Sequence, residues 1–131
     1  MVLDYNKDMN ILKVLEELKA TYPGKKIVLN DRNQCTEILC EVEPSSQHPT
    51  FSKAIAVIDL TKPHYHNSTT ETYVVLKGAL TMTIDGIERE MHEGDTVTIT
   101  PGQIHFAKGN ETWISCLSKP GWKHDDHHIV D

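Results

Sequence analysis

Cysteine is scarce in this chain: three cysteines occur among 131 residues, and none of them forms a Cys-x-x-Cys pair. An odd number of cysteines without that spacing is typical of reduced thiols in a cytosolic protein. We therefore interpret Cys35, Cys40 and Cys116 as free thiols. A zinc site built on Cys35 and Cys40 is the alternative, but their spacing exceeds that of the usual zinc-binding pair and no second pair follows.

Positive charge is also limited, because 13 lysine and arginine residues face 19 aspartate and glutamate residues, for a formal net charge of −6. Nucleic-acid binding relies on clustered Lys and Arg, and so does attraction to an anionic membrane surface. No run of five or six like charges indicates an interaction tail. The charge balance therefore argues against a nucleic-acid or membrane partner.

Long apolar runs are absent as well. The first residues, Met1-Val2-Leu3-Asp4, lack the basic region and apolar stretch of a signal peptide. No apolar segment in the sequence is long enough to cross a membrane. From these absences we expect a cytoplasmic protein.

One amphipathic helix is predicted near the N-terminus. Apolar residues at the spacing of a single helix face are Ile11, Leu12, Val14, Leu15 and Leu18. Asp8 is the expected N-cap, and Tyr22-Pro23-Gly24 is expected to end the helix. Residues 1–24 should thus form a helical segment whose apolar stripe packs on the outside of a barrel or on a second subunit.

Short segments rich in Val, Ile and Thr follow Gly24, with a period of two instead of 3.6. The predicted strands cover residues 25–29, 36–42, 51–59, 72–76, 80–84, 87–91, 96–100, 105–107 and 112–118. Asp85-Gly86 is a two-residue hairpin signal, since both positions tolerate positive φ. Many short strands with Gly and Pro turns predict one all-β sandwich or barrel over residues 25–118, followed by a C-terminal tail over 119–131.

Histidine is plentiful, with eight residues that are unevenly placed. His64 and His66 are one residue apart, which points both rings to the same side of an extended segment. Glu71 follows a polar turn, and His105 follows the tight turn that begins at Pro101. Three imidazoles and one carboxylate form a borderline ligand set suited to Mn, Fe, Co, Ni, Cu or Zn. Each residue alone would be weak evidence for a metal site.

These segments resemble the two motifs of the cupin superfamily. The first motif has the form G-x5-H-x-H-x3-4-E-x6-G and is matched by His64, His66, Glu71 and Gly78. Ile58 or Asp59 stands where its leading glycine would fall. The second motif, G-x5-P-x-G-x2-H-x3-N, is matched by Gly94, Gly102 and His105, with Thr100 at its proline and Gly109 at its asparagine. The departures fall on turn residues and spare all four candidate ligands.

The resemblance implies an all-β cupin barrel, a double-stranded β-helix or jelly roll, preceded by one N-terminal amphipathic α-helix. It also implies one divalent transition-metal ion (Fe, Mn, Ni, Zn or Co) held by His64, His66, Glu71 and His105. Octahedral coordination by four protein groups would leave two positions open for water or substrate oxygens. The short stretch between the motifs is similar to that of small one-domain cupins.

Two functions remain open, because the cupin fold hosts many activities. The first is a metalloenzyme acting on a small oxygenated metabolite, of dioxygenase, decarboxylase, lyase or isomerase type, with Tyr73 and Lys53 as candidate catalytic residues. The second is a non-catalytic module that binds or senses a small molecule or metal chelate. A structural cupin similar to seed-storage proteins is a third interpretation.

The C-terminal tail has two interpretations. The favoured interpretation of residues 119–131 is a solvated end. In the alternative, Trp122 closes the barrel mouth as part of a substrate pocket shared with Tyr73, and Asp126 or His127 reaches the open metal positions.

A homodimer is expected, because open sheet edges are usually paired or covered.

Overall fold

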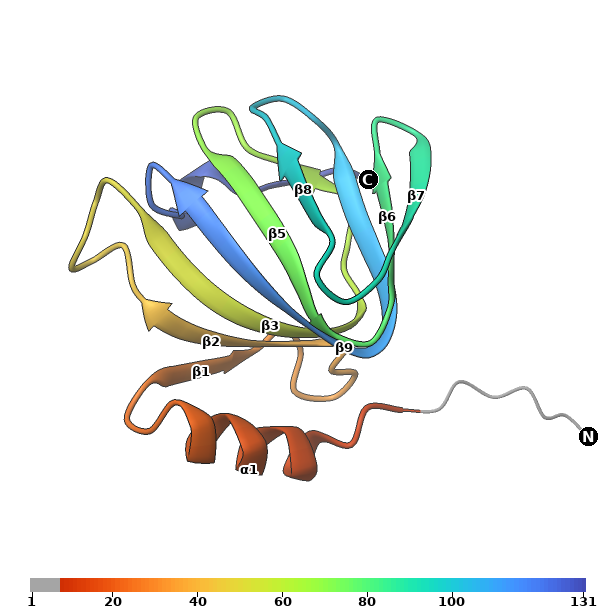
Figure 1. The fold of residues 1–131 in the computed structure, drawn as a ribbon. Coiled ribbons are helices and arrows are strands. Elements are labelled where there is room, and N and C mark those ends of the chain that lie inside the picture. The colour runs from red at the N-terminus through yellow and green to blue at the C-terminus, as the bar shows by residue number, and fades with distance from the viewer. Residues whose placement is uncertain (1–7) are drawn as a thin grey trace, which may run out of the picture.

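A computed structural model describes residues 8–131 as one helix and a strongly curled antiparallel sheet, which is the all-β barrel architecture predicted from the sequence (Figure 1). The helix, α1, spans Ile11–Thr21. The strands are β1 Lys26–Leu29, β2 Glu37–Glu43, β3 Ser52–Leu60, β4 His64–Tyr65, β5 Thr70–Lys77, β6 Leu80–Ile84, β7 Ile87–Met91, β8 Thr96–Ile99, β9 His105–Lys119 and β10 His128–Ile129. A short 3-10 helix, η1, spans His124–Asp126.

The longest strand, β9, connects most of the sheet. One of its edges pairs with β3, and its other edge pairs first with β6 and then with β5. The separate strands predicted at 105–107 and 112–118 are therefore one strand, with an irregularity near Gly109. A Cβ atom on Gly109 would lie 2.9 Å from the carbonyl oxygen of Ile58 and 2.5 Å from Oγ1 of Thr112. The lack of room explains the glycine where the cupin motif has asparagine.

The helix covers the outer face of the sheet. Its buried residues Val14 and Leu18 belong to an apolar layer that includes Ile38 of β2 and Val57 of β3. The apolar stripe of α1 thus packs on the outside of the barrel, which is one of the two alternatives predicted from the sequence. Leu12, assigned to the same stripe, is 79% exposed because it lies on the flank of the helix.

The helix N-cap is Asn10 and not the predicted Asp8. The side-chain oxygen of Asn10 accepts from the backbone N–H of Lys13 at 3.2 Å, which satisfies one free donor of the first turn. The helix therefore begins later than the sequence pattern suggested. The Asp85-Gly86 hairpin is confirmed: both residues have positive φ and join β6 to β7.

A second apolar cluster fills the inside of the curled sheet. Its buried members are Ala56, Ile58, Tyr73, Val75, Leu80, Met82, Met91, Val97, Ile99, Ala107 and Ile114. Residues of β3 therefore alternate between the two clusters, with Ile55 and Val57 facing outward toward α1 and Ala56 and Ile58 facing inward.

The C-terminal segment is not a solvated end, so the favoured interpretation of residues 119–131 was wrong. Its strand β10 pairs with β4, with His128 opposite Tyr65. The backbone N–H of Gly121 donates to Pro49, and that of Trp122 donates to Ser52 Oγ at 2.9 Å. The segment thus returns across the barrel and contributes to its mouth.

Among the described residues, no helix has the length and apolar character that a bilayer crossing requires.

Candidate functional site

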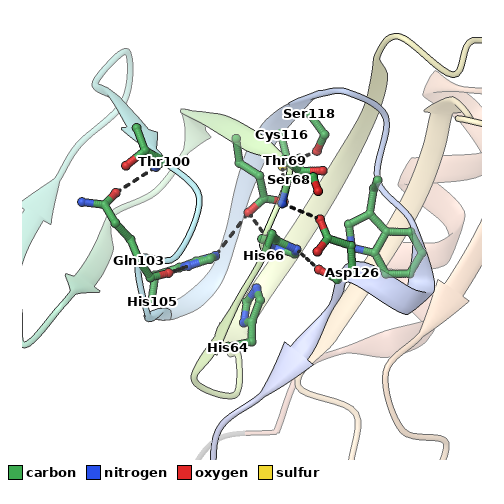
Figure 2. A network of polar contacts seen from close by, with 12 residues as sticks. His64, His66, Ser68, Thr69, Thr100, Gln103, His105, Cys116, Ser118 and Asp126 are labelled. Atoms are coloured by element: carbon green, nitrogen blue, oxygen red, sulfur yellow. Dashed lines mark hydrogen bonds and ion pairs between the residues drawn. The ribbon is translucent and has the colours of Figure 1, made fainter.

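Four side chains predicted as ligands converge at one end of the barrel. Figure 2 shows the three histidines of this group close together. His64 lies on β4, His66 directly after it, Glu71 on β5, and His105 at the start of β9 opposite His64. All four are buried, and one nitrogen or oxygen atom from each lies within 4.8 Å of the others. The group could hold a metal ion.

The backbone fixes the orientation of all three rings. Nδ1 of His64 lies 2.7 Å from the carbonyl oxygen of Lys62, and Nδ1 of His105 lies 2.9 Å from that of Gln103. Nδ1 of His66 lies 2.8 Å from the carbonyl oxygen of Asp126. Because a carbonyl oxygen only accepts, each Nδ1 must carry the proton, and each Nε2 is available to the cluster.

The carboxylate of Glu71 lies among these Nε2 atoms. Its Oε1 is 3.2 Å from Nε2 of both His66 and His105. Its Oε2 accepts from the thiol of Cys116 at 3.5 Å, which holds the second oxygen away from the rings. Burial alone would raise the pKa of Glu71, but its contacts with His105 and His66 hold it well below the ordinary value, so the carboxylate is ionised.

Burial lowers the pKa of His64 to about 4, so this ring is neutral and able to ligate at physiological pH. Burial would also lower the pKa of His66, but the Glu71 carboxylate outweighs it and the net shift is upward. A proton or another cation between Nε2 of His66 and Glu71 would therefore be stabilised.

The donor set fits a metal ion. Nε2 of His66 is buried and has no hydrogen-bond partner among the described residues, although it faces the cluster. When all three Nε2 atoms are unprotonated, they and the carboxylate oxygen repel one another unless a cation lies between them. The alternative zinc site on Cys35 and Cys40 is not supported. Both residues are free thiols: Cys40 is buried in the apolar layer beneath α1, and Cys35 packs against that layer.

A cavity of about 200 Å³ adjoins this cluster. The sequence-predicted residues Lys53, Tyr73, Trp122 and His127 all line it, together with His64 and Glu71. Burial raises the pKa of Tyr73 well above its ordinary value, so its hydroxyl stays protonated and able to donate. The structure thus brings the candidate ligands and most of the candidate pocket residues to one place.

The C-terminal segment covers this cavity from one side. The ring of His127 stacks on that of His64 with a centroid distance of 4.4 Å, and the ring centroids of Trp122 and His127 are 5.8 Å apart. Nδ1 of His127 is buried without a hydrogen-bond partner among the described residues. Burial lowers the pKa of His127, so it lies beside the cluster as a neutral ring.

Asp126 has a different place from the one predicted. Its carboxylate does not line the cavity but accepts from the backbone N–H groups of Asn67 and Ser68, at 2.8 and 3.0 Å. These hydrogen bonds outweigh desolvation and lower its pKa. Asp126 therefore clamps the turn after His66, and only its backbone carbonyl contacts a candidate ligand.

Glu37 and Cys116 are among the cavity residues that were not predicted from the sequence. Glu37 could have been found, because β2 alternates between apolar residues facing α1 and the opposite set. That opposite set is Glu37, Leu39, Glu41 and Glu43, and all of it lines the cavity. No alternation pattern marked Cys116, since a single cysteine in a strand is typical of ordinary core packing.

Comparison with known proteins gives matches over the same region. The family model for the cupin domain matches residues 55–112, which include all four candidate ligands. An uncharacterized protein of Methanocaldococcus jannaschii is 35% identical over 71 residues, 52% of this chain and 57% of that protein. An uncharacterized protein of Aquifex aeolicus is 33% identical over 78 residues, 59% of this chain and 64% of that protein. The chain thus spans less than two thirds of either curated relative it matches.

Solved structures share the fold at low sequence identity. Pac13, a nucleoside dehydratase of Streptomyces, superposes with a TM-score of 0.72 and 13% identity over 83% of this chain and 87% of that chain. Oxalate decarboxylase of Bacillus subtilis gives 0.70 and 15% identity over 83% of this chain and 31% of its own. KdgF of Halomonas gives 0.64 and 18% identity over 77% and 91%. The family-model match over residues 55–112 and the shared fold together support a small cupin domain in this chain.

Proposed function

We propose that this protein is a metal-dependent cupin enzyme that acts on a small oxygenated molecule. One divalent transition-metal ion would be held by Nε2 of His64, His66 and His105 and by the Glu71 carboxylate. The single observation that supports this most is the convergence of these four buried donors with their other polar atoms already engaged. A bound ion would supply Lewis-acid chemistry, or oxygen chemistry if it is iron.

The cavity supports a substrate site next to that cluster. Its lining contains the Tyr73 hydroxyl as a hydrogen-bond donor and Lys53 as a positive charge. Trp122 and His127 limit the access of water from the C-terminal side. Among the structural neighbours, Pac13 is a nucleoside dehydratase solved with uridine, which supports a small-molecule substrate for this fold.

Elemental analysis of the protein purified without an affinity tag tests the metal site. We expect about one transition-metal ion per chain in the wild type and almost none in the double variant His64→Ala, His66→Ala, with the β circular-dichroism spectrum kept. The matched control is His48→Ala, His92→Ala, since neither residue belongs to the cluster. Unchanged metal content in the first variant would contradict the assignment.

A non-catalytic binding or sensing cupin is the competing function. It shares the metal cluster and the cavity but needs no acid or base beside them. The carboxyl of Glu37 lines the cavity and has no partner among residues 8–131, which favours the enzyme. A metal-dependent turnover screen with keto acids, diketones and hydroxycarbonyl compounds separates the two functions.

We also propose a homodimer and a cytoplasmic location. The free edge of β1 and the exposed Leu12 support a further contact surface, although the apolar stripe of α1 is already used within the chain. Three free cysteines are compatible with a reducing compartment. Sedimentation as a monomer at micromolar concentration would count against the dimer.

A further inference from the structure

Glu37 is the first residue of β2, and its side chain lines the cavity that also borders Glu71 and Tyr73. Its backbone is held firmly. Oδ1 of Asn30 accepts from the backbone N–H of Glu37 at 3.0 Å, and the backbone N–H of Asn30 donates to the Glu37 carbonyl at 3.0 Å. The carboxyl group is therefore presented from a fixed point on a strand beside β3 (Figure 1).

The other glutamates on this face of β2 have partners, whereas none is found for Glu37 in the described part of the chain. Glu41 lies 3.7 Å from Nζ of Lys26, and Glu43 lies 3.4 Å from Nε2 of His48. For the carboxyl of Glu37, no ion pair or hydrogen bond is found among residues 8–131. A carboxyl without a partner in a cavity whose lining also includes Leu39 and Ala56 costs stability that an apolar residue would not.

Burial raises the pKa of Glu37 to about 7, and the charge of Glu71 adds to the effect. Burial is the larger cause, and it does not depend on what Glu71 binds. The titratable groups around the same cavity are Glu41, Glu43, Lys53, His64, Glu71, Tyr73, Cys116 and His127. A carboxyl group with a pKa near neutrality exchanges protons most effectively at physiological pH.

The cavity also restricts the substrate. Its volume is about 200 Å³, below the roughly 300–1,000 Å³ of pockets for drug-sized ligands, so it suits a small molecule. Its charged lining consists of four glutamates, at positions 37, 41, 43 and 71, against the single lysine Lys53. Glu41 and Glu43 have partners in Lys26 and His48, and a small neutral molecule with hydroxyl and carbonyl groups needs no counter-charge from the remaining lining.

We propose that Glu37 is the acid–base residue of this site and that the substrate is a small neutral α-hydroxycarbonyl compound. This inference rests on the proposed enzymatic function. It is carried by the placement of an unpaired carboxyl group, fixed on β2, in the same cavity as the Tyr73 hydroxyl and the four-residue cluster.

The step is a proton transfer with no oxidant or reductant. The Glu37 carboxylate takes the proton from the hydroxyl-bearing carbon, the C–H electron pair forms a C=C bond, and the carbonyl π pair moves to its oxygen. The hydroxyl of Tyr73, which lines the same cavity, can donate to that oxygen. The Glu37 carboxyl then returns a proton to the same carbon, or to the neighbouring carbon as the hydroxyl proton moves between the two oxygens, which gives the isomer.

Deuterium incorporation tests this step directly. Metal-analysed protein is incubated in D₂O with glycolaldehyde, dihydroxyacetone or glyceraldehyde, and loss of the carbon-bound proton is followed by NMR. We expect exchange of at least one probe by the wild type, a decrease of about 100-fold or more in Glu37→Gln, and partial activity in Glu37→Asp. The control Glu88→Gln alters an exposed glutamate on β7 and should exchange normally.

Two further readouts separate the possible failures. The pH profile of exchange should rise through the Glu37 pKa, measured independently by carbon-13 NMR of the carboxyl group. Metal content should be equal in the wild type and Glu37→Gln. Exchange that needs Glu37 in a protein without metal supports Glu37 and overturns the metal proposal. A metal-loaded wild type that exchanges none of the probes, or a Glu37→Gln variant with wild-type exchange, overturns the role of Glu37.

Discussion

Two regions of this molecule are equally buried but differ in composition. Beneath α1, Leu18 and Ile38 have no exposed surface and meet only a layer built from apolar side chains. At the barrel mouth, His66 and His105 are 3% and 0% exposed, yet they meet a carboxylate and each other. Burial of apolar side chains in the first region stabilises the fold, whereas burial of polar groups in the second region is destabilising unless those groups are paired.

The difference shows how burial and chemistry are separated in a small barrel. The outer layer and the inner apolar cluster make the sheet stable, which allows a few buried polar residues at one end. Their geometry is maintained by backbone carbonyls, which no side-chain substitution removes. Changes in the two regions should therefore have separable effects on stability and on metal content.

The largest effect on stability is expected in the outer layer. Leu18→Ala should lower the free energy of unfolding by about 2–5 kcal/mol, because it leaves a cavity where no water enters. Metal content at pH 7.5 should not change in the fraction that stays folded. Leu12→Ala, on the same helix but 79% exposed, is the control and should cost less than about 0.5 kcal/mol. Urea denaturation measures both, and equal costs would contradict the separation.

The second prediction concerns pH at the barrel mouth. Metal ligation needs neutral imidazoles, so metal bound at pH 7.5 should be released as the pH falls below about 6. His66, whose pKa is raised, should protonate first, and His64, whose pKa is about 4, should protonate late. Metal content after dialysis at a series of pH values checks this. Retention of the ion at pH 4.5 would contradict it.

The smallest effect is expected at the clamp between the C-terminal segment and the turn after His66. Asp126→Asn keeps the shape of the side chain but weakens its two bonds to the N–H groups of Asn67 and Ser68. We expect a loss of about 1 kcal/mol in stability and a small decrease in metal affinity. Asp125→Asn, its exposed neighbour, serves as the control. Thermal denaturation with calorimetric metal titration would show whether the two variants differ.

Much of this could be predicted from the sequence because period and spacing are local signals. The alternation of apolar residues placed most strands, and the spacing of His64, His66, Glu71 and His105 agrees with the buried cluster. Contacts between segments that are far apart in the sequence could not be predicted from such local signals. The pairing of His128 with Tyr65 depends on where the chain goes after Pro120, and no local pattern encodes that path. The burial of Glu37 likewise depends on what lies across the barrel from it.

One hydrogen bond joins two parts of the chain that are 60 residues apart: Nδ1 of His66 donates to the carbonyl oxygen of Asp126. Any ligand that requires His66 in this orientation also favours the docked form of the C-terminal segment. By thermodynamic linkage, docking of that segment must favour the ligand by the same factor. The backbone amides of residues 124–129 should therefore become more protected from hydrogen exchange when the cluster is occupied, so the last turn of the chain reports on the state of the site.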